Sequence, residues 1–435
     1  MIKVTFMGAG STVFARNVLG DCMCTPALHG LDIALYDIDA VRLEESQRML
    51  EAINRNVQAE ATIRSYLGVE NRREALRGAD FVVNAIQVGL YEPCTVIDFE
   101  VPKKFGLRQT IADTLGIGGI FRALRTIPVM MDFAEDMKAV CPNAWFLNYT
   151  NPMAMLTGAM LRMTDIKTVG LCHSVQVCAK SLFESVGMEN DPDVQTKIAG
   201  INHMAWLLEI TKNGKDLYPE IKAKADALTE KHDNMVRLEI MKRFGYYVTE
   251  SSEHNAEYMP FFIKDKYPEL IDRFNIPLDE YPRRCIRQIE DWKTRSETLT
   301  RDPNLSHERT HEYASYIIEA MVTNKPYRIG GNVLNTGLIT NLPRNAVVEV
   351  PCLIDASGVS PTYIGDLPEI CAALNRTNIN VQLLTIEAAR TLRKDYIYQA
   401  AMMDPHCQSE LSIDDIVKLC DALIEAHKGW LPEFH

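Results

Sequence analysis

The sequence has no excess of positive charge and no long apolar segment. Lysine and arginine number 46 against 58 aspartate and glutamate residues, a formal net charge of −12. Proteins that bind nucleic acid or an anionic membrane surface usually carry a basic face, so neither partner is expected. No apolar run approaches the roughly 18 residues that cross a bilayer.

Paired cysteines and a secretion signal are also missing. The eleven cysteines are odd in number and lack the spacing of a small disulfide framework. The N-terminal residues MIKVTFMGAG do not place a basic segment before an apolar one, as a signal peptide would. Reduced thiols are typical of a reducing compartment, so a cytoplasmic protein is expected.

The first half alternates short apolar segments with helical patterns, which is typical of βαβ units and a parallel sheet. A Rossmann-type nucleotide-binding domain is therefore predicted, with ligands at the carboxyl ends of its strands. The strand candidates are Ile2–Met7, Ile33–Tyr36, Phe81–Ile86, Trp145–Leu147 and Thr168–Leu171.

The pattern changes past about Gly200, where the predicted helices become longer and more charged. Residues 328–351 indicate strands and loops, and a final helix is predicted over Val381–Ala401. At roughly 100–200 residues per domain, we predict a nucleotide domain over 1–195. Residues 196–435 then form a mixed α+β domain, as in lactate and malate dehydrogenases.

A glycine-rich turn follows the first predicted strand. Gly8, Gly10 and Ser11 would let the backbone approach a pyrophosphate at a helix N-terminus. Val13 departs from the usual third glycine, so a plain strand-to-helix turn is the alternative. Asp37 ends the second strand, where a carboxylate binds ribose hydroxyls and repels a 2′-phosphate, although a solvated turn residue is also possible. These residues favour NAD over NADP.

A thiol and two imidazoles follow later apolar segments. Cys172 and His173 come after one strand, and His203 follows Ile198–Ile201. A thiolate and an imidazole suit a borderline divalent ion. No short paired-ligand spacing is present, so packing roles for Cys172 and His203 remain open from spacing alone.

Seven motifs together give the chain a resemblance to the family 4 glycoside hydrolases, which are NAD-dependent and usually Mn²⁺-dependent. The resemblance covers nearly the whole chain, and within the family it is similar to the α-galactosidase branch. The motifs are GAGST at 8–12, DTLGIGGIFRALRTIP at 113–128, NYTNPM at 148–153, CHSV at 172–175, GINH at 200–203, SEHNAEY at 252–258 and NLP at 341–343.

The resemblance implies a role for each candidate residue. Cys172 and His203 would hold the metal, while His173 would be the acid and Tyr258, in a segment shared with His254 and Glu257, the base. Asn151 would contact the sugar, and Asp113 lies in a motif near cofactor and sugar. The implied reaction oxidises C3 transiently, removes the C2 proton, eliminates the aglycone and adds water. Each role has a purely structural alternative. His173 could be a hydrogen-bonded loop residue, Tyr258 an interface residue, and Asn151 the start of a turn.

An unphosphorylated substrate is expected. Phospho-sugar members of the family carry Asn or Asp where this chain has His173, and an arginine near the stretch QVGLYEPC, which has none. Ser174 favours a neutral α-galactoside such as melibiose over an α-galacturonide. The resemblance also implies a homodimer or homotetramer.

Other functions remain as alternatives. An α-glucosidase or α-galacturonidase would belong to the same family. A 2-hydroxy-acid dehydrogenase would consume NAD and would not need the Cys172/His203 pair. An NAD-sensing or sugar-binding regulator would bind ligand without turnover.

Overall fold

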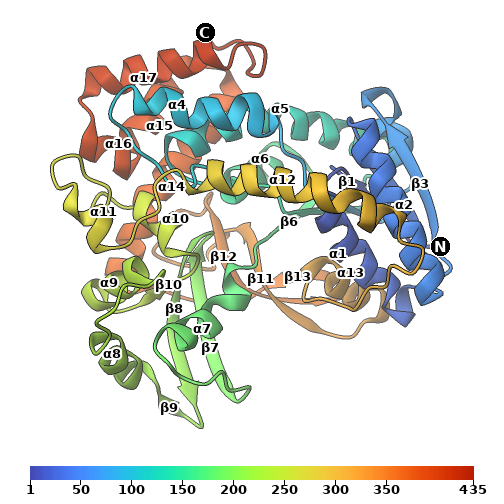
Figure 1. The fold of residues 1–435 in the computed structure, drawn as a ribbon, viewed down its shortest axis with the longest axis horizontal. Helices are drawn as coiled ribbons and strands as arrows, with labels where there is room; N and C mark the ends of the chain where they lie inside the picture. Colours follow the sequence, from blue (N-terminus) through green and yellow to red (C-terminus); the bar gives the residue numbers. More distant parts are fainter.

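A single mixed sheet runs through the molecule (Figure 1) in the computed structural model, which describes residues 1–435. Its thirteen strands follow the order β10-β8-β7-β12-β11-β6-β5-β4-β1-β2-β3, with β13 beside β12 and β9 beside β8. Strands β1 to β6 are parallel in the order 3-2-1-4-5-6, so the predicted Rossmann-type fold is confirmed.

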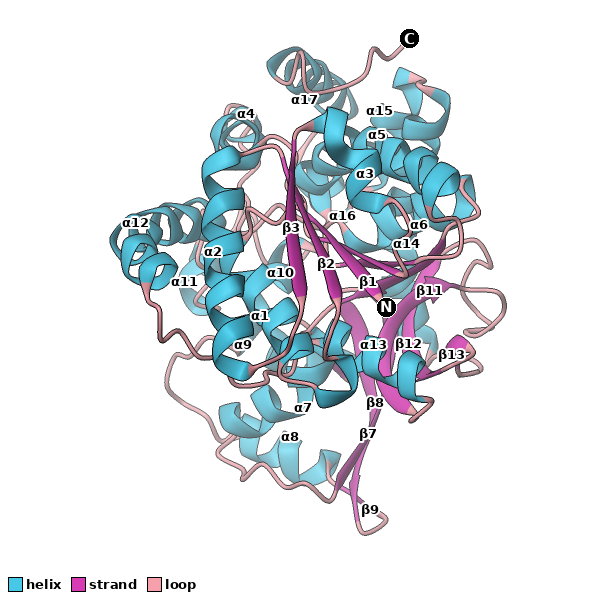
Figure 2. Ribbon diagram, turned by 90° about the vertical axis from the view of Figure 1, so that its right-hand side faces the viewer, coloured by secondary structure: helices cyan, strands magenta, loops and turns pink.

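Helices cover both faces of this parallel half. Figure 2 shows α1 and α2 on one side of β1, β2 and β3, and α3 and α5 on the other. Coverage on both faces explains why every residue of β1 and β4 is buried. The strands are β1 (Lys3–Met7), β2 (Asp32–Asp37), β3 (Thr62–Leu67), β4 (Phe81–Asn84), β5 (Trp145–Asn148) and β6 (Lys167–Leu171). The helices are α1 (Thr12–Met23), α2 (Ala40–Val57), α3 (Arg72–Leu76), α4 (Val96–Lys103), α5 (Gly116–Val140), α6 (Met153–Met163) and α7 (Ser174–Ser185).

The second half extends the same sheet with antiparallel strands. β11 pairs with β6 and starts the extension, and β7 contains the predicted boundary at residue 195. These strands are β7 (Val194–Ile201), β8 (Met204–Lys212), β9 (Lys215–Asp216), β10 (Tyr247–Val248), β11 (Tyr327–Leu334), β12 (Val347–Asp355) and β13 (Gly358–Pro361). The helices are α8 (Tyr218–Asp226), α9 (Met235–Phe244), α10 (Ser252–Glu257), α11 (Glu269–Arg273), α12 (Glu280–Arg301), α13 (Tyr313–Thr323), α14 (Glu369–Thr391), α15 (Lys394–Met403), α16 (Pro405–Glu410) and α17 (Ile413–Ala426).

The prediction of one helix over Val381–Ala401 is wrong. Leu392 adopts a left-handed conformation with φ 57°, and its N–H bonds the carbonyl of Ala388. This geometry ends a helix, so the segment divides into α14 and α15. None of the helices has both the length and the apolar character needed to cross a membrane.

One cluster of buried apolar side chains runs from Val4 to Leu423, so the two halves share a core. A buried ionic cluster also joins them. Asp98 on α4 accepts two bonds from the Arg125 guanidinium of α5, at 3.1 and 2.6 Å, and its Oδ1 lies 2.9 Å from His427 Nε2 after α17. Arg125 Nε also donates to the Val88 carbonyl at 3.1 Å.

Replacing Asp98 with alanine should lower the free energy of unfolding by about 3–5 kcal/mol, because a buried guanidinium would lose its partner. Urea unfolding would measure the change. The control is Glu74→Ala, which removes an exposed partner of Arg77 and should have far less effect. A loss below about 1 kcal/mol at Asp98 would show that the cluster does not anchor the C-terminal helices.

Candidate functional site

The turn between β1 and α1 has room only for glycine at two positions. Gly8 has φ 87°, and a Cβ there would lie 2.8 Å from the Ala85 carbonyl oxygen. A Cβ at Gly10 would lie 2.8 Å from Asp37 Oδ2. The hydroxyl of Ser11, at the N-cap of α1, makes no capping bond. The N-terminus of α1 thus has no side-chain cap, which suits an anionic group such as a pyrophosphate.

Asp37 braces this turn from the end of β2. Its Oδ2 accepts the Gly10 N–H at 2.6 Å, and its Oδ1 accepts the N–H groups of Ile38 and Asp39 at 2.8 and 2.9 Å. The carboxylate therefore lies beside the glycine turn, and its binding to ribose stays a prediction.

A cavity of about 280 Å³ opens at the carboxyl ends of the parallel strands. It brings together five of the predicted residues, namely Ser11, Asp113, Asn151, Cys172 and His173. The other lining residues are Phe14, Ala85, Ile86, Gln87, Arg122, Tyr149, Thr150, Met153, Leu171 and Tyr281. Gly8 and Gly10 lie in the adjoining turn, and Asp37 lies beside it at the end of β2. His203 and Tyr258 are buried and do not line the cavity.

Three donor atoms of different kinds converge at Cys172. The Sγ of Cys172, a ring nitrogen of His203 and a carboxylate oxygen of Glu250 all lie within 4.8 Å of one another. His203 Nε2 is 3.3 Å from Glu250 Oε2. Both His203 and Glu250 have positive φ, 61° and 64°, a conformation that persists only where the surrounding fold enforces it. Sulfur, nitrogen and oxygen donors fit a borderline divalent ion.

The charges of His203 and Glu250 stabilise each other. Burial alone would lower the pKa of His203, but Glu250 and Cys172 outweigh it and raise that pKa to about 10. Burial alone would raise the pKa of Glu250, but His203 and His254 bring it down to about 2. A divalent cation would therefore replace a proton on His203, and its affinity should rise with pH.

Glu250 is the functional candidate that sequence reasoning missed. It stands two residues before the SEHNAEY motif, where no strand or helix pattern shows which way it points. Only the pairing of β10 with β8 places Glu250 next to the turn that carries His203.

Tyr258 lies behind the cluster. Its hydroxyl is 3.1 Å from His203 Nδ1, the side chain is 1% exposed, and burial raises its pKa well above the ordinary value. A hydroxyl in this position fixes the tautomer and orientation of the imidazole.

Asp113 is positioned by the residue before Tyr258. The carboxylate of Glu257 accepts the N–H groups of Thr110 and Ala112 at 2.8 Å each, which fixes the backbone just before Asp113. Burial raises the pKa of Glu257 to about 7, although these amide bonds oppose the shift. Asp113 Oδ1 is also 3.7 Å from His254 Nε2.

His173 and Asn151 reach the cavity from two loops. His173 precedes α7, and its Nε2 lies 2.7 Å from Glu312 Oε2. That bond raises the pKa of His173 against the opposing effect of burial. Asn151 Oδ1 accepts the Met153 N–H at 3.2 Å, so its amide nitrogen remains available to a ligand.

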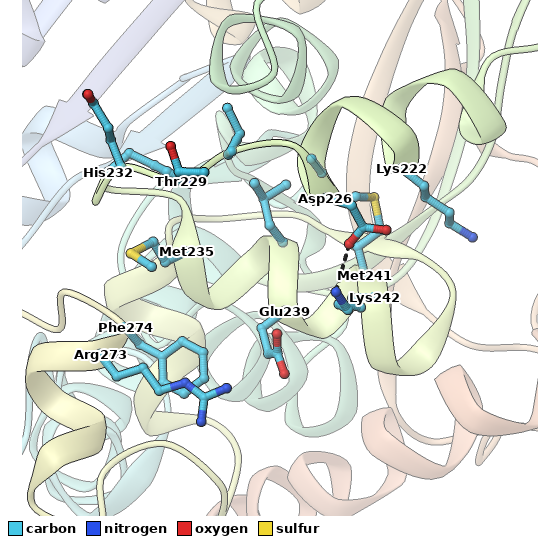
Figure 3. Close-up of a pocket in the computed structure, with 14 residues that line it drawn as sticks. Lys222, Asp226, Thr229, His232, Met235, Glu239, Met241, Lys242, Arg273 and Phe274 are labelled. Atoms are coloured by element: carbon cyan, nitrogen blue, oxygen red, sulfur yellow. Dashed lines mark hydrogen bonds and ion pairs between the residues drawn. The ribbon is translucent and has the colours of Figure 1, made fainter.

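A second hollow of about 330 Å³ lies between α8, α9 and α11 (Figure 3). Its lining mixes both signs of charge, including the ion pair of Asp226 with Lys242 at 2.7 Å. No predicted residue and no cluster of metal-type donors lies there. The smaller cavity is therefore the candidate active site.

Fold and site together define a dinucleotide-type α/β protein with a candidate transition-metal centre beside its nucleotide turn. The chain belongs to the family 4 glycosyl hydrolases, because the family profile matches residues 3–188 and the profile of the family's C-terminal domain matches residues 198–407. The resemblance predicted from the motifs is thus confirmed.

Individual relatives agree with this membership. The chain is 63% identical to an alpha-galactosidase of Bacillus subtilis (strain 168) over 100% of both chains. Among solved structures, a putative glucosidase from Bacillus subtilis has a TM-score of 0.86 at 24% identity, covering 97% of this chain and 99% of that one. A 6-phospho-alpha-glucosidase from gut microorganisms, in complex with NAD and Mn²⁺, has a TM-score of 0.79 at 20% identity over 100% of both chains.

Replacing Cys172 with serine or His203 with alanine should weaken Mn²⁺ binding at least about tenfold, because each substitution removes a donor. Glu250→Gln should do the same if its carboxylate is the third donor. Calorimetric titration of the reduced protein would measure the affinity. Cys24→Ser, which alters a thiol outside the cluster, is the control. Unchanged affinity in the Cys172 variant would exclude this metal site.

Proposed function

We propose that the protein hydrolyses terminal α-galactosides, such as melibiose, with NAD and a divalent ion, Mn²⁺ in the first instance. The observation that carries this proposal is the cluster of Cys172, His203 and Glu250, which lies against the same cavity as the glycine turn. The relative that is 63% identical, named alpha-galactosidase, supports the substrate, and the structure described with NAD and Mn²⁺ supports the cofactors.

Both cofactors have fitting residues. Gly8, Gly10, Ser11 and Asp37 would hold NAD, while Cys172 and His203, with Glu250, would hold the metal. When bound, the nicotinamide supplies reversible oxidation at C3 and the ion supplies Lewis acidity at the neighbouring oxygens. In this arrangement residues 1–195 provide the nucleotide site and residues 196–435 complete the metal site.

The remaining chemistry belongs to the side chains. Asn151 and Asp113 would orient the sugar from the cavity wall. With C3 oxidised, the C2 proton is acidic, and Tyr258 is the proposed base. His173 would protonate the departing glycosidic oxygen, after which water adds to C1.

The absence of a phosphate on the substrate also remains a proposal. Gln87 is the one residue of the stretch Gln87–Leu90 that lines the cavity, and Arg122 of α5 also lies in the cavity wall. Its guanidinium donates to the Tyr281 hydroxyl at 3.4 Å and stacks over that ring. A free α-galactoside and its 6-phosphate must therefore be compared directly, and activity on the phosphorylated sugar alone would contradict the proposal.

Hydrolysis of 4-nitrophenyl α-galactoside under reducing conditions should require both NAD⁺ and Mn²⁺. The assay would use protein stripped of nucleotide and metal, with each added alone and together. Free NADH should not accumulate, because the cofactor returns to its oxidised form in each cycle. Activity that survives complete removal of NAD⁺ would overturn the mechanism, and stoichiometric NADH would favour a dehydrogenase.

Tyr258→Phe separates two roles for this hydroxyl. If Tyr258 is the base, the variant should lose exchange of the C2 hydrogen in D₂O while Mn²⁺ affinity stays near that of the unaltered protein. If Tyr258 only orients His203, as its 3.1 Å contact allows, Mn²⁺ affinity should fall about 10–100-fold with exchange retained at saturating metal. NMR of the galactose product and metal titration would distinguish these results, and Tyr247→Phe is a buried-tyrosine control.

A further inference from the structure

A segment from the second half of the chain is fixed against the helix of the nucleotide turn. Asp21 is fully buried near the end of α1, and its carboxylate makes three contacts with the segment 307–310. His307 Nε2 lies 2.7 Å from Oδ1, the Thr310 N–H donates to Oδ1 at 2.8 Å, and the Thr310 hydroxyl donates to Oδ2 at 2.7 Å. Gly20 permits this approach, since a Cβ there would lie 2.6 Å from the His307 ring.

The same segment is held at the cavity. The Glu312 N–H donates to the Thr310 hydroxyl oxygen at 3.3 Å, and the Ala314 N–H donates to the hydroxyl of Tyr149, which lines the cavity, at 2.8 Å. Gln176 of α7 donates to the His311 carbonyl at 3.0 Å. Glu312 thus approaches His173 from backbone that is fixed at several points.

Glu312 then contacts one cavity residue, His173. The distance from Oε2 to His173 Nε2 is 2.7 Å, the carboxylate is 11% exposed, and it makes no other ion pair. His173 is half-exposed, and its other neighbour is the Tyr149 ring, with ring centroids 6.0 Å apart. A half-exposed imidazole needs such a partner to keep one orientation, and the bond to Glu312 leaves Nδ1 as the nitrogen open to a ligand.

We propose that Glu312 is a positioning residue for the reaction. It fixes the ring of His173, while Asp21 fixes the segment that carries Glu312. The same helix, α1, therefore supports both the nucleotide turn at its first residues and the cavity histidine through its last turn. This inference rests on the proposed function only in the role given to His173.

The test is a double-mutant cycle of Glu312→Gln and His173→Ala, followed with 4-nitrophenyl and methyl α-galactosides. Partners that orient metal-bound histidines matter about 10–100-fold, and by analogy E312Q should lower kcat by a factor of this order. The NAD⁺ affinity should not change. Adding E312Q to H173A should cause no further loss, because the two residues act as one unit. The methyl galactoside should suffer more than the nitrophenyl one, since its leaving group depends more on the acid.

Glu319→Gln is the matched control. Glu319 lies on α13, pairs with Arg309 at 2.7 Å and does not contact His173. Its substitution should leave kcat unchanged. Full, additive losses in the double variant, or equal losses in E312Q and E319Q, would overturn the positioning role.

A second measurement does not depend on activity. In full-length protein labelled with ¹⁵N-histidine, the ring signals of His173 are identified by their loss in H173A. They should move in E312Q and remain in place in E319Q. If no α-galactoside is hydrolysed but these signals move, the proposed function fails and the contact stands. If hydrolysis occurs but E312Q leaves both kcat and the signals unchanged, the inference fails and the function stands.

Discussion

The pairing of β11 with β6 is the join on which the rest of the structure depends. Only two residue pairs form it, Gly331 with Leu171 and Asn332 with Gly170. A Cβ at Gly170 would lie 2.9 Å from the Cβ of Asn332, so the strands can approach only because a glycine stands there. Through this join the antiparallel strands continue the Rossmann sheet, and Cys172, one residue beyond β6, comes to face the turn that carries His203.

The pairing of β11 with β6 also brings together the opposite charges of the site. His203, which is buried, and Glu250, which is partly buried, come from the antiparallel extension and lie against Cys172 from the parallel half. Isolated buried charges would be costly, whereas a histidinium and a carboxylate 3.3 Å apart compensate each other. The same pair would supply two of the proposed metal ligands if a cation replaced the proton. The Tyr258 hydroxyl contacts the His203 ring, and the Glu312 carboxylate contacts the His173 ring. These contacts orient both imidazoles, so that the cavity needs little rearrangement to bind its ligands.

Much of the fold could be predicted from local pattern. Short apolar runs predicted five of the six parallel strands, and the residues between the runs predicted the glycine turn and Asp37. The edge strand β3 was missed, because its sequence TIRSYL is polar and partly exposed. The single helix predicted over Val381–Ala401 was wrong because the left-handed conformation of Leu392 has no signal in apolar periodicity. The way the second half joins the first was also beyond prediction, since pairing of strands distant in sequence depends on tertiary packing.

The sequence by itself determined the family, the dinucleotide-type half and most candidate residues, because motifs and strand periodicity are local properties of the chain. It also placed Cys172 and His173 at a strand end, where parallel strands present ligands. Only the tertiary structure brought Glu250 to Cys172 and His203, and Tyr258 to Nδ1 of His203. It also brought Glu312 to His173 across 139 residues. Those contacts depend on backbone conformation and on which strands pair, and the local sequence around each residue specifies neither.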